Sequence, residues 1–177
     1  GDITAIIPKM INSGLLCTHE RYRRGLNISG MSSKEDLRRG GGDGVFLRMW
    51  ADKERASYNG ESSSLGFGSN LFLIFNKKIL DRQDYYCYSS DHYGSTEGGD
   101  FEQRITPIEL LKLQLQTGWS GNNELIFRHG ISFRDVDFIA TGSEDAKAKL
   151  MKTLTGSKIN EINGQPIDSF IKIAESY

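Results

Sequence analysis

Short apolar runs and short amphipathic stretches follow one another along this chain without strictly alternating, and this order constrains the fold more than any other feature. A regular alternation would predict a doubly wound parallel sheet, whereas an irregular order favours an α+β fold. The chain has 177 residues, of which 37% are hydrophobic and 25% are charged. These values are typical of a globular protein, so we predict a single α+β domain over residues 1–177.

The predicted strands are short runs of apolar and aromatic residues. The clearest is the continuous apolar run LFLIF at residues 71–75, which is typical of a fully buried strand. A tight turn at residues 163–166 (NGQP) is expected to end the last strand. The remaining strands are predicted at residues 14–18, 45–50, 85–88, 124–127, 135–140 and 159–162.

The predicted helices are short as well. Thr106 is a suitable N-cap for one of them, because Pro107 follows at the first helical position. Gly25 is placed to end another at its C-terminal cap. Apolar spacing, helix-forming residues or a capping box indicate helices at residues 3–11, 19–24, 32–39, 107–116 and 143–154.

The composition narrows the classes of function. A formal net charge of -1 gives no overall preference for nucleic acid or for an anionic membrane. Cys17 and Cys87 form no CxxC pair, so two free thiols are favoured over a disulfide. The three histidines are scattered and no HExxH pattern exists, so no metal site is expected. No membrane partner is expected either, because no apolar run reaches the roughly 20 residues of a membrane span.

Two residues stand where a predicted strand meets a loop, a kind of position that often carries function. Glu124 precedes the apolar residues 125–127, so its carboxylate could face a cleft; the alternative is an exposed glutamate at a strand start. Phe46 follows Gly44, which permits a close approach of backbone or ligand, so the ring could stack on a flat heterocycle. The alternative for Phe46 is a core residue of a buried strand.

Three segments, taken together and in order, resemble the ADP-ribosyltransferase superfamily. They are residues 15–18 (LLCT), 42–47 (GDGVFL) and 123–126 (NELI). In that family a first strand reads Leu-Leu-x-His-Gly-Thr, a later strand Gly-x-Gly-Ile-Tyr-Phe and a last strand Asn-Glu-Tyr-Ile. The likeness is to the diphtheria-toxin and poly(ADP-ribose) polymerase side and to bacterial toxin and prophage members. It covers residues 14–140 and implies split mixed and antiparallel sheets with short flanking helices.

The resemblance implies NAD⁺ as co-substrate and no metal. Glu124 matches the family glutamate, which would bind the 2′-hydroxyl of the nicotinamide ribose and favour the oxocarbenium-like transition state. Phe46 matches the family tyrosine that stacks on nicotinamide, and it keeps the ring without the hydroxyl.

The remaining cofactor contacts depart from the family pattern. Thr18 stands where the family has the histidine that holds the adenosine-side ribose, and His19 next to it could substitute. Arg21 or Arg48 could bind the pyrophosphate of NAD⁺ through two hydrogen bonds, although for each one taken alone a surface arginine is the favoured interpretation.

Two residues near Glu124 bear on the acceptor, which is the group that would receive ADP-ribose. Asn122 stands where arginine-modifying relatives have a glutamate, which argues against arginine as the acceptor. Trp119 lies in the loop that the family uses to choose targets, where it could stack on a base or pack under its own loop.

The sequence therefore predicts an NAD⁺-dependent mono-ADP-ribosyltransferase, a bacterial toxin or effector that modifies a protein or nucleic acid. The alternatives are an NAD⁺ glycohydrolase and, in another class, a catalytically inactive binding or interaction domain. An immunity or antitoxin protein is an expected partner. The expected place of action is the cytoplasm of the producing or a target cell, with delivery as the toxin domain of a larger secreted protein.

Overall fold

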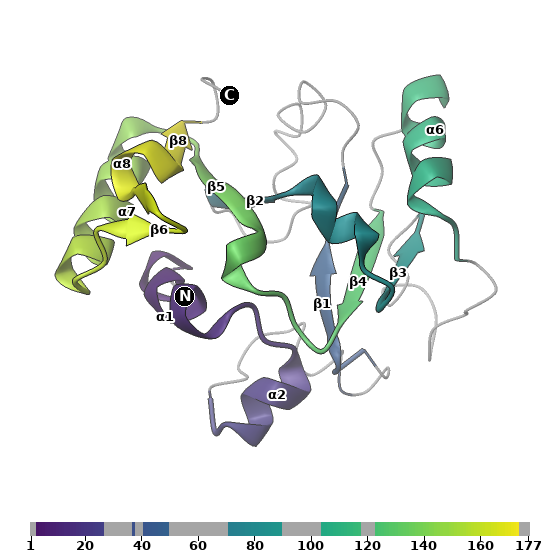
Figure 1. Cartoon of the computed structure of the whole chain (residues 1–177), viewed down its shortest axis with the longest axis horizontal. Coiled ribbons are helices and arrows are strands. Elements are labelled where there is room, and N and C mark those ends of the chain that lie inside the picture. Colours follow the sequence, from purple (N-terminus) through teal and green to yellow (C-terminus); the bar gives the residue numbers. More distant parts are fainter. Residues whose placement is uncertain are drawn as a thin grey trace. The chain divides into compact units, whose positions relative to one another are not determined.

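The computed structural model describes residues 3–26, 37, 41–49, 71–89, 104–117 and 123–173. The chain divides into two compact units. The first comprises Gly1–Leu15, Glu61–Asp81 and Ser132–Tyr177, and the second comprises Leu16–Gly60 and Arg82–Ile131. Each unit contains one three-stranded sheet (Figure 1).

The second unit holds an antiparallel sheet with β4 (Glu124–Arg128) in the centre. Its neighbours are β1 (Gly44–Leu47) and β3 (Tyr85–Tyr88), and Figure 1 shows β4 between them. The apolar centre of β4, residues 125–127, is buried. This burial anchors the sheet, because each large apolar side chain removed from water contributes about 1.5 to 3 kcal/mol.

Two helices of the second unit have the ends expected from the sequence. The helix α6 (Pro107–Thr117) is capped by the preceding Thr106, whose hydroxyl accepts a hydrogen bond from the Glu109 N–H at 3.2 Å. The Glu109 carboxylate accepts a bond from the Thr106 N–H at 2.6 Å, which completes a capping box. The helix α2 (Thr18–Arg23) is followed by Gly25 in the left-handed region, with φ of 65°.

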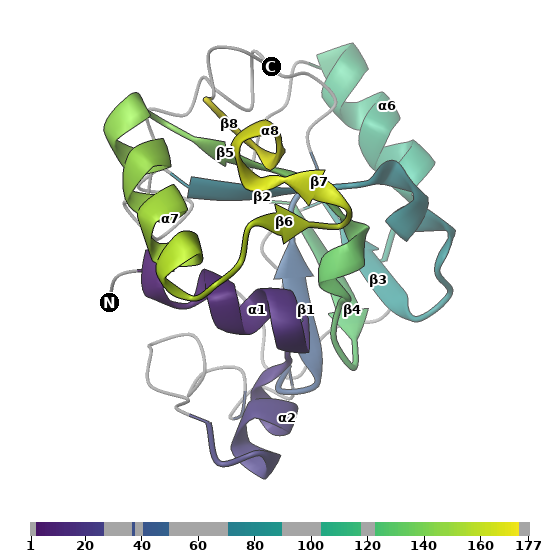
Figure 2. The same ribbon diagram turned by 60° about the vertical axis from the view of Figure 1, so that its left-hand side comes forward.

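The first unit holds a mixed sheet. Strand β5 (Val136–Thr141) pairs antiparallel with β2 (Leu71–Phe75) and parallel with β8 (Ile171–Ile173). A small hairpin of β6 (Glu161–Ile162) and β7 (Gln165–Pro166) leads into α8 (Ile167–Phe170), as Figure 2 shows. The other helical elements of this unit are η1 (Ile3–Ala5), α1 (Ile7–Ser13), η3 (Lys77–Asp81), η5 (Phe133–Asp135) and α7 (Glu144–Gly156).

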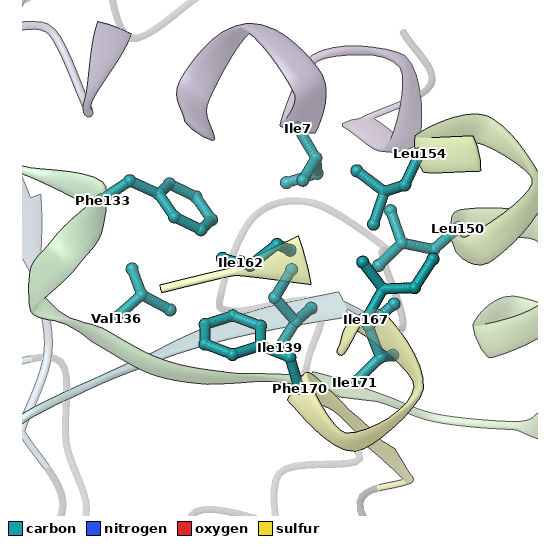
Figure 3. Close-up of a cluster of buried hydrophobic side chains, with 10 residues drawn as sticks. All are labelled: Ile7, Phe133, Val136, Ile139, Leu150, Leu154, Ile162, Ile167, Phe170 and Ile171. Atoms are coloured by element: carbon teal, nitrogen blue, oxygen red, sulfur yellow. The ribbon is translucent and has the colours of Figure 1, made fainter. Parts of the chain in front are cut away.

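The core of the first unit lies between its helices and β5. Figure 3 shows Ile7 of α1 and Leu150 and Leu154 of α7 directed toward Ile139 of β5. The exposed fraction of each of these four side chains is 0%. The cluster is completed by Phe133, Val136, Ile162, Ile167, Phe170 and Ile171.

The predicted α+β class, with split mixed and antiparallel sheets, is confirmed. The strands at residues 71–75, 85–88, 124–127 and 135–140 and the helices at 107–116 and 143–154 are present within a residue or two of their predicted bounds. Ser143 caps α7 by accepting a hydrogen bond from the Ala146 N–H. Within the described ranges, no helix combines the length and the apolar character that a membrane span requires.

Three predictions about local structure are wrong. Residues 14–18 form no extended strand: Leu15 is an isolated bridge and Thr18 already begins α2. The run at residues 71–75 is a strand, but it is half-buried throughout rather than fully buried. The first helix is divided into η1 and α1, since Pro8 fits the first turn of a new helix better than the interior of a continuous one. Two strands are shorter than predicted: β1 ends at Leu47 although residues 48–49 are described, and β6 begins only at Glu161. The helix predicted at residues 32–39 lies almost wholly outside the described residues, as does Trp50 of the predicted strand 45–50.

Candidate functional site

The sheet of the second unit places Glu124 and Phe46 on one face. Phe46 of β1 is the cross-strand partner of Ile126 of β4, and directly opposed residues of an antiparallel pair share a face. Glu124 precedes Ile126 by two residues on β4, so its side chain emerges on that same face. Glu124 and Phe46 are therefore diagonal neighbours, and both side chains are half-buried.

Two tyrosines of β3 belong to this face as well. Tyr88 is the partner of Glu124, and Tyr86 is the partner of Ile126. Tyr88 is 2% exposed, so one flank of Glu124 is covered by a buried aromatic residue. The face thus carries a carboxylate beside two half-buried aromatic rings, those of Phe46 and Tyr86, an arrangement suited to a flat, partly charged ligand.

The two glycines of the predicted motif have identifiable neighbours. A Cβ atom at Gly44 would lie 2.6 Å from the Ile126 Cγ2, so Gly44 is required by the contact between β1 and β4. A Cβ atom at Gly42 would lie 2.5 Å from the His19 Nε2. The close approaches predicted for this segment are therefore to side chains of the protein itself.

The first turn of α2 is fastened to the start of β1. The His19 N–H donates a hydrogen bond to the Gly42 carbonyl at 2.7 Å, and the His19 ring packs over Gly42. Thr18 is buried, with 4% of its surface exposed, whereas His19 is exposed. Of these two side chains, that of His19 is the more accessible, and it stands beside the start of the strand that carries Phe46.

The two candidate arginines occupy different positions in this unit. Arg48 directly follows β1 and is half-buried; one further step of the register Leu47–Leu125 sets it opposite Glu124. Arg21 lies on α2 and is also half-buried.

Two ion pairs lie at the end of these strands that is away from Glu124. Arg128, at the end of β4, forms an ion pair with Asp43 and lies over the ring of Tyr86, 5.9 Å from its centroid. Arg82 holds the carboxylate of Asp84 through two nitrogens and lowers the pKa of that carboxyl below its usual range. These pairs fix the end of β4 that is remote from Glu124.

The sequence did not assign a role to the residue immediately before Glu124. The side chain of Asn123 is fully buried, and its carboxamide binds the backbone of Met49 through two hydrogen bonds. Gln114 of α6 donates a third bond to the same residue. One sequence signal was available: Gln114 follows Leu110 by four residues, so a polar side chain stands on the apolar stripe of that helix.

Two predicted acceptor residues, Trp119 and Asn122, lie outside the described residues. Among the residues that the structure does describe, no group of three or more His, Cys, Asp or Glu side chains is arranged to hold a metal ion. Both cysteines are free and buried.

Comparison with known proteins shows a likeness to a solved structure. No protein-family model and no curated protein sequence matches the chain. Among solved structures, Thermosipho africanus DarTG, determined in complex with ADP-ribose, is similar in fold, with a TM-score of 0.62 and 14% sequence identity. The match covers 96% of this chain and 47% of the DarTG chain, so the present chain spans less than half of that length. The likeness agrees, at the level of the fold, with the architecture implied by the resemblance to ADP-ribosyltransferases.

Proposed function

We propose that this chain is an NAD⁺-dependent mono-ADP-ribosyltransferase with Glu124 as its catalytic carboxylate. The observation that carries the proposal is the position of Glu124 and Phe46 as diagonal neighbours on one face of a single sheet. In the family pattern these two side chains line a common site. Placement of the two on opposite faces of the sheet would have excluded such a site. The fold likeness to a protein that holds ADP-ribose supports the same direction, since ADP-ribose is the group that NAD⁺ donates.

The proposed chemistry assigns Glu124 to the reacting ribose. Its carboxylate accepts a hydrogen bond from the ribose 2′-hydroxyl and stabilises the positive charge that develops at the anomeric carbon. The bond between that carbon and the nicotinamide nitrogen breaks, and the electron pair leaves with nicotinamide. The acceptor then bonds to the anomeric carbon and loses a proton. The half-buried setting of Glu124 strengthens its electrostatic effect, because a charge next to buried groups is screened less than one in open water.

The proposed binding contacts follow the geometry of the second unit. Phe46 stacks on the nicotinamide ring, and the half-buried Tyr86 extends the aromatic surface beside it. His19, rather than the buried Thr18, is the better candidate for the adenosine-side ribose. Arg48 or Arg21 supplies the positive charge for the pyrophosphate.

The acceptor in this proposal is a macromolecule, either a protein or a nucleic acid, and the chain acts as a bacterial toxin or effector. The uncharged Asn122 disfavours arginine as the modified group, because a second carboxylate to orient a guanidinium is absent from that position. Trp119 is proposed to contact the acceptor. An activity of this kind calls for an immunity or antitoxin partner in the producing cell.

The test uses NAD⁺ labelled in its adenylate half, incubated with the protein and a cell lysate. We expect label on macromolecules from the wild type and a loss of turnover of at least about 100-fold for Glu124→Gln, the size expected when a transition-state electrostatic partner is removed. The matched control is Glu161→Gln, which neutralises an exposed glutamate that also begins a strand; its activity should equal the wild type.

Each alternative has its own outcome in this experiment. Release of free ADP-ribose without labelled macromolecules would indicate a glycohydrolase. A folded wild-type protein that consumes no NAD⁺ would contradict the proposal and favour a binding or interaction domain.

A further inference from the structure

We infer that the buried carboxamide of Asn123 is a positioning group that fixes the carboxylate of Glu124 at the start of the central strand β4. The inference rests on the proposed function, because it makes Asn123 responsible for the position of the proposed catalytic carboxylate of Glu124. Asn123 itself is fully buried and acts through the backbone, so it is a positioning residue.

The first observation is the way in which Asn123 binds Met49. The Asn123 Oδ1 accepts a hydrogen bond from the Met49 N–H at 2.8 Å, and the Asn123 Nδ2 donates one to the Met49 carbonyl at 2.8 Å. A side-chain amide and a peptide group have the same donor and acceptor, so the side chain acts here as a substitute for a neighbouring strand.

The second observation is that this side-chain pair keeps the register of the sheet. The last backbone pair between β1 and β4 is Leu47 with Leu125. Two steps further along the same register, Met49 lies opposite Asn123. These are the two residues that the hydrogen bonds of the Asn123 carboxamide join. Arg48 and Glu124 lie between these two pairs. Their backbone positions are therefore fixed on both sides, although neither belongs to the β1–β4 ladder.

The third observation is the support from Gln114. Its Nε2 donates a hydrogen bond to the Met49 carbonyl at 2.8 Å, so that oxygen accepts two bonds. Gln114 is 2% exposed and comes from α6, which also contacts β3. The bond thus ties the end of β1 to a helix packed on the opposite edge strand of the same sheet.

A clamp of this kind should act on the chemical step more than on ground-state binding. The contribution of Glu124 to the proposed reaction depends on the direction of its carboxylate, and a misplacement of about 1 Å can lower a rate about 100-fold. Stacking on Phe46 does not depend on Asn123, because Phe46 lies within the backbone ladder. Loss of the clamp should consequently lower kcat and leave the affinity for NAD⁺ largely intact.

The experiment compares three folded variants with the wild type in steady-state NAD⁺ cleavage and in NAD⁺ binding by calorimetry. Asn123→Ala removes both bonds to Met49 without adding a charge, and Gln114→Leu removes the third bond while keeping Asn123. The matched control is Asn163→Ala in the other unit, which loses two Asn side-chain bonds to the carbonyls of Phe133 and Val136. Asn163 has a φ of 52°, so this control loses stability at least as readily as the test variant.

We expect Asn123→Ala to lower kcat by about 10- to 100-fold with NAD⁺ affinity within about twofold of the wild type. Gln114→Leu should lower kcat in the same direction by less, and Asn163→Ala should leave it unchanged. The Met49 amide hydrogen should exchange with solvent faster in Asn123→Ala, while the amide of Phe46 keeps its protection.

Two results would overturn the inference while the proposed function stands: an active wild type with unchanged kcat in folded Asn123→Ala, or equal losses of kcat in Asn123→Ala and Asn163→Ala. If Asn123→Ala fails to fold, Gln114→Leu decides, and an unchanged kcat there would overturn the inference. An inactive, folded wild type contradicts the proposed function itself, which is a separate outcome from either of these.

Discussion

Phe46 and Ile126 face each other across the β1–β4 ladder, and this pairing sets the ring of Phe46 on the face of the sheet from which Glu124 emerges. The ring is half-buried, and β1 is an edge strand among those described. An aromatic side chain in that position retains surface on which a heterocycle can stack.

Replacement of Phe46 by alanine should weaken NAD⁺ binding. Loss of one stacking ring typically costs about 1 to 3 kcal/mol of binding free energy, whereas Phe46→Tyr keeps the ring and should bind as the wild type does. Calorimetry of NAD⁺ binding measures both. The matched control is Phe138→Ala, which removes a half-buried phenylalanine from β5 of the other unit. Equal affinity in wild type and Phe46→Ala would remove Phe46 from the site.

Introduction of a methyl group at Gly44 should destabilise the second unit. The new Cβ would lie 2.6 Å from the Ile126 Cγ2, and overpacking of a buried contact costs about 1 to 3 kcal/mol of unfolding free energy. Gly156→Ala is the control, because a Cβ there meets nothing within 4 Å. In denaturant titrations, the cost of Gly44→Ala should shrink in an Ile126→Ala background, since the clashing methyl is then absent. Purely additive effects would show that the contact is not the cause.

The sequence predicted the elements whose signals are local. The capping box at Thr106, the N-cap at Ser143 and the glycine after α2 each depend on residues within one turn of helix, so they could be identified without tertiary information. The apolar run at residues 125–127 likewise placed Glu124 at the start of a strand.

The parts that the sequence did not predict depend on distant partners. Residues 14–18 have apolar character, but Thr18 begins α2, whose first turn is bonded to the distant Gly42 carbonyl through the His19 N–H. The role of Asn123 needs Met49, which is 74 residues away. The burial of β2 depends on the segments that cover its two faces, and these come from elsewhere in the chain. No local pattern contains this information, and Phe46 could be placed beside Glu124 only through a family resemblance.

The thiol of Cys87 should make stability fall as the pH rises above 9. Burial, followed by the negative charge of Glu109, raises the pKa of Cys87 from 9.0 to about 12. Between these values the unfolded chain has lost the proton and the native protein keeps it, so alkaline solution favours unfolding. Urea titrations at pH 8 and pH 10 should show a smaller loss of stability for Cys87→Ala than for the wild type. A native thiol that iodoacetamide alkylates as fast as the unfolded chain would contradict this assignment.

The carboxylate of Glu20 should stabilise α2 at neutral pH and cease to do so in acid. Hydrogen bonds from Arg23 and then from Arg24 lower its pKa from 4.5 to about 2. A lowered pKa adds stability above the unfolded value of 4.5, and this stability is lost as the pH falls toward 2. A paired carboxylate becomes protonated between about pH 5 and pH 2. The difference in unfolding free energy between the wild type and Glu20→Gln, measured by circular dichroism, should therefore shrink over this range. A difference that stays constant over this range would exclude the carboxylate as its source.

In the sheet of the second unit, β1 (Gly44–Leu47) pairs with β4 (Glu124–Arg128), which lies far along the chain. During synthesis a ribosome makes the first of these strands long before the second, and pairing between distant segments forms slowly. A nascent chain therefore holds Phe46 without the strand that carries Glu124. In the proposed function, the cell that makes this protein is exposed to the activity only after synthesis has passed Arg128 and the two strands have paired.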